Sequence, residues 1–201
     1  MRKILEDMRI DKNTPVEDIK FVIADVETTG LIPQKDRVCE IAMSVLKNFR
    51  EMDRFVSLIN PEVSIRPDVS KIHGITDDMV KNSPKFSDVL NQVLDILYDG
   101  VIVGHNIDFD YEFIRCEFER LGYTIPDIYR VDTLKISKRF CSNVPNNKLE
   151  TIARSMNLFS NEWHRAENDV VMTTRIFENF LRTFIKENNV VTLNDLLKIT
   201  N

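Results

Sequence analysis

The stretch Phe21-Val22-Ile23-Ala24-Asp25-Val26-Glu27-Thr28-Thr29-Gly30 decides the fold of this chain. Its first half is apolar and rich in β-branched residues, and Thr28-Thr29-Gly30 interrupts the run, so we expect a strand over residues 21–27. Nearly continuous apolarity before the acids predicts a central strand that is covered on both faces. Asp25 and Glu27 lie two residues apart, so their side chains project from the same face of that strand.

Elsewhere the pattern predicts a run of strands and then strands that alternate with helices. We expect further strands over residues 37–47, 54–59, 101–104 and 128–131, with a polar turn at residues 48–53. Helices are expected over residues 86–97, 108–121, 133–140, 147–156 and 167–186, with short helical pieces around 70–72 and 76–79, a helix start at Thr14-Pro15-Val16-Glu17 and a small helix after Thr192. This order predicts an α/β fold: a mixed five-stranded sheet flanked by helices on both faces.

Length and composition indicate one ordinary globular domain. With 201 residues, 43% hydrophobic and 29% charged, the chain can bury a substantial core. We divide it into an N-terminal extension (1–19), weakly structured or a short surface helix over residues 1–13, a main domain (20–186) and a short C-terminal helical extension (187–201). The chain lacks signal-peptide and membrane-spanning patterns, and its three separated cysteines read as inert thiols, so we expect a cytoplasmic protein with no membrane partner.

Charge is uneven along the chain. The net charge of −5 argues against a protein that coats long nucleic acid by charge alone. Between residues 128 and 165, however, seven bases face three acids: Arg130, Lys135, Lys138, Arg139, Lys148, Arg154 and Arg165 against Asp132, Glu150 and Glu162. This segment is either a solvated helix face or a rim that guides phosphates beside a site.

Four acids and one histidine form the candidate site. Asp25 and Glu27 end the first strand, where simple solvation is the alternative explanation for the pair. Converging carboxylates repel one another, and a hard divalent cation such as Mg²⁺ or Mn²⁺ gives them a reason to converge. A histidine beside such a cluster can accept a proton from a metal-held water, which suggests phosphodiester hydrolysis.

Two further motifs supply the other candidates. In His105-Asn106-Ile107-Asp108-Phe109-Asp110, Asp108 stands where a helix N-cap is expected, whereas Asp110 can point back toward the first strand. Helix geometry favours Asp110 without deciding between the two. His164 precedes Asp169 by five residues, and Asp169 falls in the first turn of a predicted helix. Alone, such a pair is more often a surface histidine and a helix-start acid.

Taken together, the motifs resemble those of the DEDDh 3′–5′ exonucleases in order and spacing. The likeness rests on Phe21 to Gly30, Ile72-His73-Gly74-Ile75-Thr76, His105 to Asp110 and His164 to Asp169. It is greatest to the proofreading exonuclease subunit or domain of bacterial DNA polymerase III, and it makes residues 20–186 an exonuclease domain. The resemblance implies an RNase H-like fold and two divalent cations, Mg²⁺ or Mn²⁺.

The resemblance also assigns roles to individual residues. It implies that Asp25, Glu27 and Asp169 ligate metal directly, with Asp25 bridging both ions, that Asp110 supports the second ion and that His164 is the general base. It selects Asp110 over Asp108, because the family places this acid after the phenylalanine, and it interprets His73 and Asp132 as structural. The terminal nucleotide would be seated by the backbone of Thr28, Thr29 and Gly30 and by the region of His105 and Asn106.

The expected function follows from these roles. The chain is interpreted as a metal-dependent 3′–5′ exonuclease that releases nucleoside 5′-monophosphates from a nucleic acid with a free 3′ end. DNA is the expected polymer, proofreading or repair the expected setting, and a replicative polymerase a candidate partner. The alternatives are an exonuclease of RNA or short oligonucleotides and a non-catalytic nucleic-acid-binding module.

Overall fold

The strand predicted from the opening stretch lies at the centre of the fold. The computed structural model describes residues 3–4, 10–125, 127–159 and 164–200. β2 (Lys20–Thr28) is the middle strand of a five-stranded sheet with the order β4-β3-β2-β5-β7. It pairs antiparallel with β3 (Val38–Lys47) and parallel with β5 (Gly100–Gly104), and β4 (Arg50–Leu58) and β7 (Arg130–Asp132) form the edges. The predicted mixed five-stranded sheet is confirmed.

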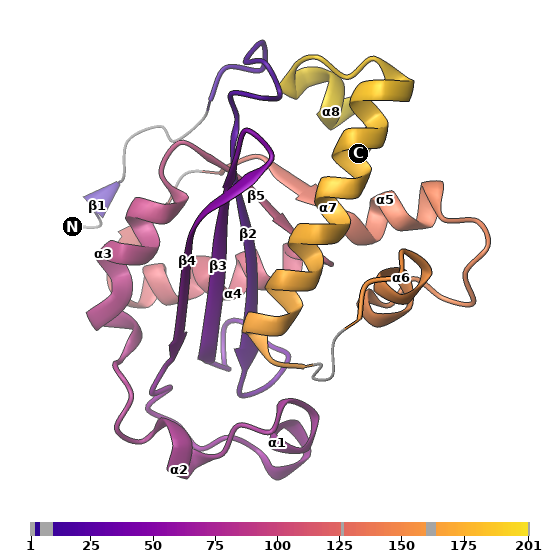
Figure 1. The fold of residues 1–201 in the computed structure, drawn as a ribbon. Coiled ribbons are helices and arrows are strands. Elements are labelled where there is room, and N and C mark those ends of the chain that lie inside the picture. The colour runs from indigo at the N-terminus through magenta and orange to yellow at the C-terminus, as the bar shows by residue number, and fades with distance from the viewer. Residues whose placement is uncertain (1–2, 5–9, 126, 160–163, 201) are drawn as a thin grey trace.

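Helices cover both faces of this sheet, as predicted (Figure 1). On one face lie α7 (Ala166–Asn188), α5 (Thr133–Phe140), α6 (Leu149–Ser155) and α8 (Leu193–Thr200). On the other lie α3 (Phe86–Leu97) and α4 (Ile107–Arg120). Because side chains alternate along a strand, Phe21 packs against Phe177 of α7 with ring centroids 4.9 Å apart, while Val22 enters the opposite core. The short helices α1 (Pro67–His73) and α2 (Asp77–Val80) lie beyond the end of β2.

The connection between β3 and β4 is shorter than the predicted polar turn at residues 48–53. Asn48 and Phe49 both have positive φ angles, 50° and 57°, and the two strands pair up to Lys47 and Arg50 on either side of them. A two-residue turn of this kind matches the natural twist of paired strands. The polar residues that follow it belong to β4, because an edge strand exposes its side chains to water.

The N-terminal segment also departs from the prediction. The helix start expected at Thr14-Pro15-Val16-Glu17 is wrong, because these residues form turns whose backbone groups bond a distant segment. Val16 N–H donates to the Val191 carbonyl, and Leu193 N–H donates to the Thr14 carbonyl. Lys3–Ile4 (β1) forms a small parallel pair with Tyr123–Thr124 (β6), where weak structure or a helix was expected. The expectation for residues 1–2 and 5–9 lies outside the described residues.

Smaller differences concern element boundaries. The strand expected at 128–131 spans Arg130–Asp132, and the helix expected at 147–156 spans Leu149–Ser155. The three cysteines are free thiols, with Cys39 and Cys116 buried. Among the described helices, none has the length and apolarity that crossing a membrane would need.

Candidate active site

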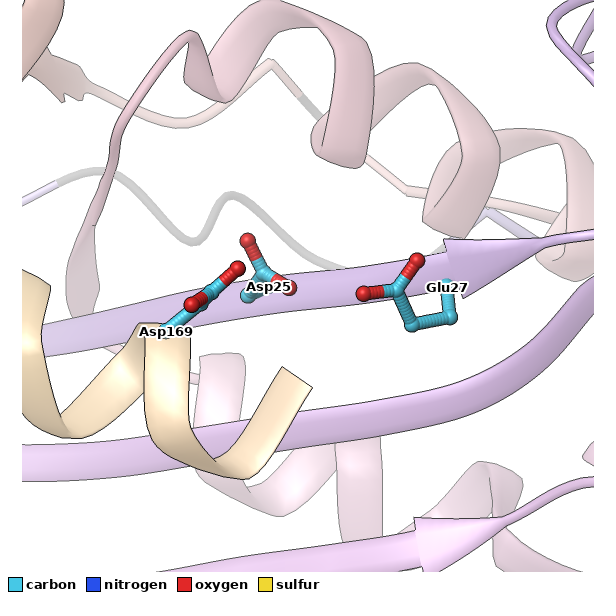
Figure 2. A group of neighbouring side chains, drawn as sticks. All are labelled: Asp25, Glu27 and Asp169. Atoms are coloured by element: carbon cyan, nitrogen blue, oxygen red, sulfur yellow. The ribbon is translucent and has the colours of Figure 1, made fainter. Parts of the chain in front are cut away.

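The end of β2 presents Asp25 and Glu27 to the face of the sheet that α7 covers. The two residues alternate with Ala24 and Val26, which belong to the opposite core, so the carboxylates share one face. α7 begins at Ala166 and places Asp169 in its first turn beside them, as Figure 2 shows. Carboxylate oxygens of Asp25, Glu27 and Asp169 all lie within 4.8 Å of one another, and each residue is partly open to solvent. Two segments that lie far apart in the sequence, β2 and the start of α7, are therefore brought together.

These three carboxylates hold one another in an unfavourable electrostatic state. Burial and the neighbouring charges of Asp169 and Glu40 together raise the pKa of Glu27 to about 8. Burial also raises the pKa of Asp169 to about 6 and that of Asp25 well above its ordinary value, the latter with help from Asp110 and Asp169. A protein that maintains such a cluster is expected to neutralise it with cations.

The donor set fits a hard divalent cation. Oδ1 of Asp169 is buried and has no hydrogen-bond partner within the described part of the chain. A buried charged oxygen without a partner is unfavourable, and a cation shared with Asp25 and Glu27 would satisfy it. The oxygen-only ligands favour Mg²⁺ or Mn²⁺ over metals that prefer nitrogen or sulfur. Asp25, Glu27 and Asp169 are therefore the residues that would hold a metal most directly.

The structure separates the two acids of the second motif. Asp110 is buried in the first turn of α4, and its Oδ1 accepts a hydrogen bond of 3.0 Å from the backbone N–H of Val26, between the two β2 acids. Burial raises its pKa to about 7. Asp108 instead turns outward to ion-pair with Arg130 (2.9 Å) and Lys135 (3.1 Å). Its expected role as the N-cap is wrong, because Asn106 holds that position, with φ 77° and no side-chain cap bond.

His164 lies at the entrance to α7. Its backbone has a φ of 62°, its side chain is exposed, and its backbone hydrogen-bonds the Asp169 carboxylate. Residues 160–163, the predicted loop just before it, lie outside the described residues. The structure therefore brings the histidine to the acid cluster and leaves its imidazole accessible from solvent.

Glu40 is a residue of this site that the sequence reasoning missed. It stands opposite Glu27 on β3, and its side chain is only 1% exposed. It accepts hydrogen bonds from Arg165 (2.6 Å) and from the backbone N–H of Ala166 (3.0 Å), so it anchors the start of α7. An acid inside the apolar run of residues 38–46 was the signal that could have revealed it.

A pocket of about 250 Å³ opens beside Glu27. Thr28 and Gly30, two of the predicted substrate residues, line it together with apolar side chains that the sequence did not single out: Val26, Leu31, Val69, Ile72 and Phe109. Leu31 and Ile72 are 74% and 62% exposed, so the pocket has an apolar mouth. A mainly apolar pocket whose lining also includes the polar residues Glu27, Arg66, Asp68 and His73 suits a nucleobase.

The remaining residues of the end of β2 support this pocket. Thr29 is buried, and its backbone and hydroxyl bond Arg37, so it does not line the pocket. A Cβ at Gly30 would overlap the Asp36 carboxylate, so a larger residue there would displace that side chain. His73 accepts a hydrogen bond from Ile75 N–H at Nδ1 and lies 3.3 Å from the Thr28 carbonyl at Nε2, which fits the structural role expected for it.

His105 and Asn106 lie at a different hollow, at the end of β5. His105 Nε2 is 2.7 Å from the Asn147 carbonyl, and because a carbonyl only accepts, this nitrogen carries the proton. Asp132 accepts hydrogen bonds from Asn106 N–H (2.9 Å) and Leu134 N–H (2.8 Å), so it caps α5 as the sequence predicts. Neither His105 nor Asn106 lines the pocket beside Glu27.

Comparison with known proteins places this arrangement in context. A family model described as Exonuclease matches residues 22–177. DNA polymerase III PolC-type of Caldanaerobacter subterraneus subsp. tengcongensis is 35% identical over 162 residues, which cover 81% of this chain and 12% of the relative. The 3′-5′ exonuclease DinG of Bacillus subtilis is 34% identical over 163 residues, 81% of this chain and 18% of the relative. The chain thus spans less than a fifth of the length of either protein.

Solved structures share the fold. Exonuclease X in complex with 5′ overhanging duplex DNA superposes with a TM-score of 0.68 and 22% identity, covering 90% of this chain and 99% of that one. Exonuclease I of E. coli in complex with a dT13 oligonucleotide gives a TM-score of 0.76 at 19% identity, covering 86% of this chain and 43% of that one. At these identities the likeness concerns the RNase H-like fold, which is thereby confirmed.

Proposed function

The chain belongs to the exonuclease family, and from this premise we propose that it is a metal-dependent 3′–5′ exonuclease that releases nucleoside 5′-monophosphates, with DNA as the polymer. The observation that carries the proposal is the meeting of Asp25, Glu27 and Asp169 within 4.8 Å on the family's scaffold. Cations held by these carboxylates would let an anionic phosphodiester approach a cluster that would otherwise repel it.

We assign the residues as follows. Asp25, Glu27 and Asp169 would hold two divalent cations, Mg²⁺ or Mn²⁺, and Asp110, which accepts from Val26 N–H, would support the second. When bound, these cations supply charge stabilisation at the attacking and departing oxygens. His164 accepts the proton of the attacking water. The hydrogen bond between the His164 backbone and the Asp169 carboxylate holds this general base close to a metal ligand.

The pocket beside Glu27 seats the 3′-terminal nucleotide. Its apolar walls, from Leu31, Ile72 and Phe109, suit a base, and Thr28 and Gly30 also line it. This extends the expected substrate residues by three apolar side chains. The PolC-type and DinG relatives support a setting in replication or repair and a polymerase as a partner.

The decisive experiment offers 5′-labelled single-stranded DNA, DNA with a mispaired 3′ end and RNA in the presence of Mg²⁺, Mn²⁺ or EDTA. We expect stepwise shortening from the 3′ end, release of nucleoside 5′-monophosphates and complete inhibition by EDTA. Asp25→Ala is the matched control, because it removes a ligand shared by the whole cluster and excludes a contaminating nuclease. Binding of these strands without cleavage under every metal condition would overturn the proposal in favour of a non-catalytic module.

A further inference from the structure

A groove of about 510 Å³ lies at the end of β5, the strand next to β2 in the sheet, and shares no lining residue with the pocket beside Glu27. β2 and β5 are parallel with Ile23 opposite Val103, so His105 stands level with Asp25 and on the same face of the sheet. The groove is walled by α5, through Leu134 and Lys138, and by residues 146–148. A strand whose 3′ end occupies the pocket beside Glu27 would pass the carboxylates and enter this groove.

The charge of the groove is positive and uncompensated. Lys138 and Lys148 line it, no carboxylate does, and neither lysine forms an ion pair within the described ranges. Most other bases of the segment are paired: Lys135 and Arg130 with Asp108, Arg154 with Glu150 and Arg165 with Glu40. Arg139 donates to the Ile199 carbonyl. The two lysines therefore remain available for an external anion.

The walls of the groove are fixed in place. His105 Nε2 donates to the Asn147 carbonyl (2.7 Å), which ties residues 146–148 to the end of β5. Asn146 Oδ1 accepts from the Lys148 backbone N–H (3.0 Å) and from the Thr151 hydroxyl (2.7 Å). A cation presented by a loop that is held at three points loses less conformational freedom on binding than one on a free loop.

We propose that this groove binds phosphates of the substrate strand on the 5′ side of the scissile bond, with Lys138 and Lys148 as the phosphate ligands. The inference rests on the proposed exonuclease function and adds to it a subsite that makes activity depend on strand length. The class of ligand is a single-stranded phosphodiester backbone, since lysine recognises the charge of a phosphate and not the identity of the base.

The experiment compares hydrolysis of dT2 and dT12 by the wild type and by the double variant Lys138→Ala/Lys148→Ala. We expect kcat/KM to fall about tenfold for dT12, through KM, and less than twofold for dT2, which has no extended 5′ strand. The slope of log KM against log salt for dT12 should fall by about 1.4, because each phosphate contact on a single strand contributes about 0.7. Anisotropy of labelled dT12 in EDTA should show the same loss without any turnover.

Lys135→Ala/Lys198→Ala is the matched control: it removes two cations that are already paired with Asp108 and Asp195. It should leave the ratio of the dT12 and dT2 activities unchanged. Equal losses of the groove variant on both substrates would overturn the proposal. A duplex with a recessed 3′ end serves as a third substrate, and a loss confined to it would also overturn the proposal and assign the groove to the complementary strand. Absence of hydrolysis by the wild type would instead refute the proposed function.

Discussion

Replacing one acid of the cluster should stabilise the metal-free protein at high pH. Glu27 normally ionises near pH 4.5, whereas in the fold its pKa is raised to about 8. The folded state therefore holds a proton that the unfolded state has released, and stability falls as pH rises from about 4.5 through 8. Glu27→Gln has no such proton to lose, so its stability should not show this fall.

The magnitude follows from the shift. One pKa unit corresponds to about 1.4 kcal/mol. Without solvent screening, the shift of Glu27 would therefore lower the unfolding free energy by roughly 4–5 kcal/mol once the group is ionised. Glu27 is partly exposed, and solvent screening lowers the expected difference to about 2–3 kcal/mol at pH 8. At pH 5, where the folded-state carboxyl is neutral and resembles the amide, the two proteins should differ by less than about 1 kcal/mol.

Urea unfolding at pH 5, 6, 7 and 8 in EDTA measures this difference. His73 and His105 have lowered pKa values, so they add stability as the pH rises toward the ordinary pKa of histidine. The wild type and Glu27→Gln both contain these histidines, so their effect cancels in the comparison. Saturating Mg²⁺ should raise the stability of the wild type at pH 8 more than that of Glu27→Gln. Parallel stability curves from pH 5 to pH 8 would refute the electrostatic reasoning.

Three further variants test other parts of the site. His164→Ala should lower kcat by about 10²–10⁴-fold while Mn²⁺ affinity, followed by calorimetry, stays near that of the wild type; near-normal turnover would exclude the general-base role. Glu40→Ala should lower the unfolding free energy in Mg²⁺ at pH 6 by about 1–3 kcal/mol, because the buried Ala166 N–H loses its acceptor. Glu40→Gln should restore part of the lost stability, and equal losses in both variants would count against that hydrogen bond. Asp108→Asn should change stability by less than about 1 kcal/mol, since its ion pairs are exposed, and a collapse of activity on DNA would show that Asp108, too, belongs to the site.

The parts of the fold that the sequence predicts are those in which local pattern and tertiary burial agree. Phe21 to Ala24 are apolar on both faces of β2, so a buried central strand satisfies every residue. The same alternation determines that Asp25 and Glu27 share a face. Thr14-Pro15 carries a good local helix signal, yet its backbone bonds residues 191–193, a pairing that no local pattern contains.

The site was predictable to the extent that its residues carry charge. Acids and histidine stand out in a sequence, and the family motifs fix their order. The pocket beside Glu27 was not predictable, because Leu31, Ile72 and Phe109 look like ordinary apolar residues until their three distant segments meet in the fold. Asp110 and Asp108 separate only in three dimensions, where one accepts from Val26 and the other pairs with Arg130.

The charges of the whole molecule explain why the site and the groove need each other. With a net charge of −5 and raised carboxylate pKa values at the catalytic end, the metal-free protein offers an approaching phosphodiester little attraction there. Lys138 and Lys148, which form no ion pair within the described residues, provide attraction that does not depend on a cation, at the end of the strand next to β2. Strand affinity should therefore reside mainly in the groove, while the carboxylate cluster gives up its protons to bind the cations that the chemistry needs.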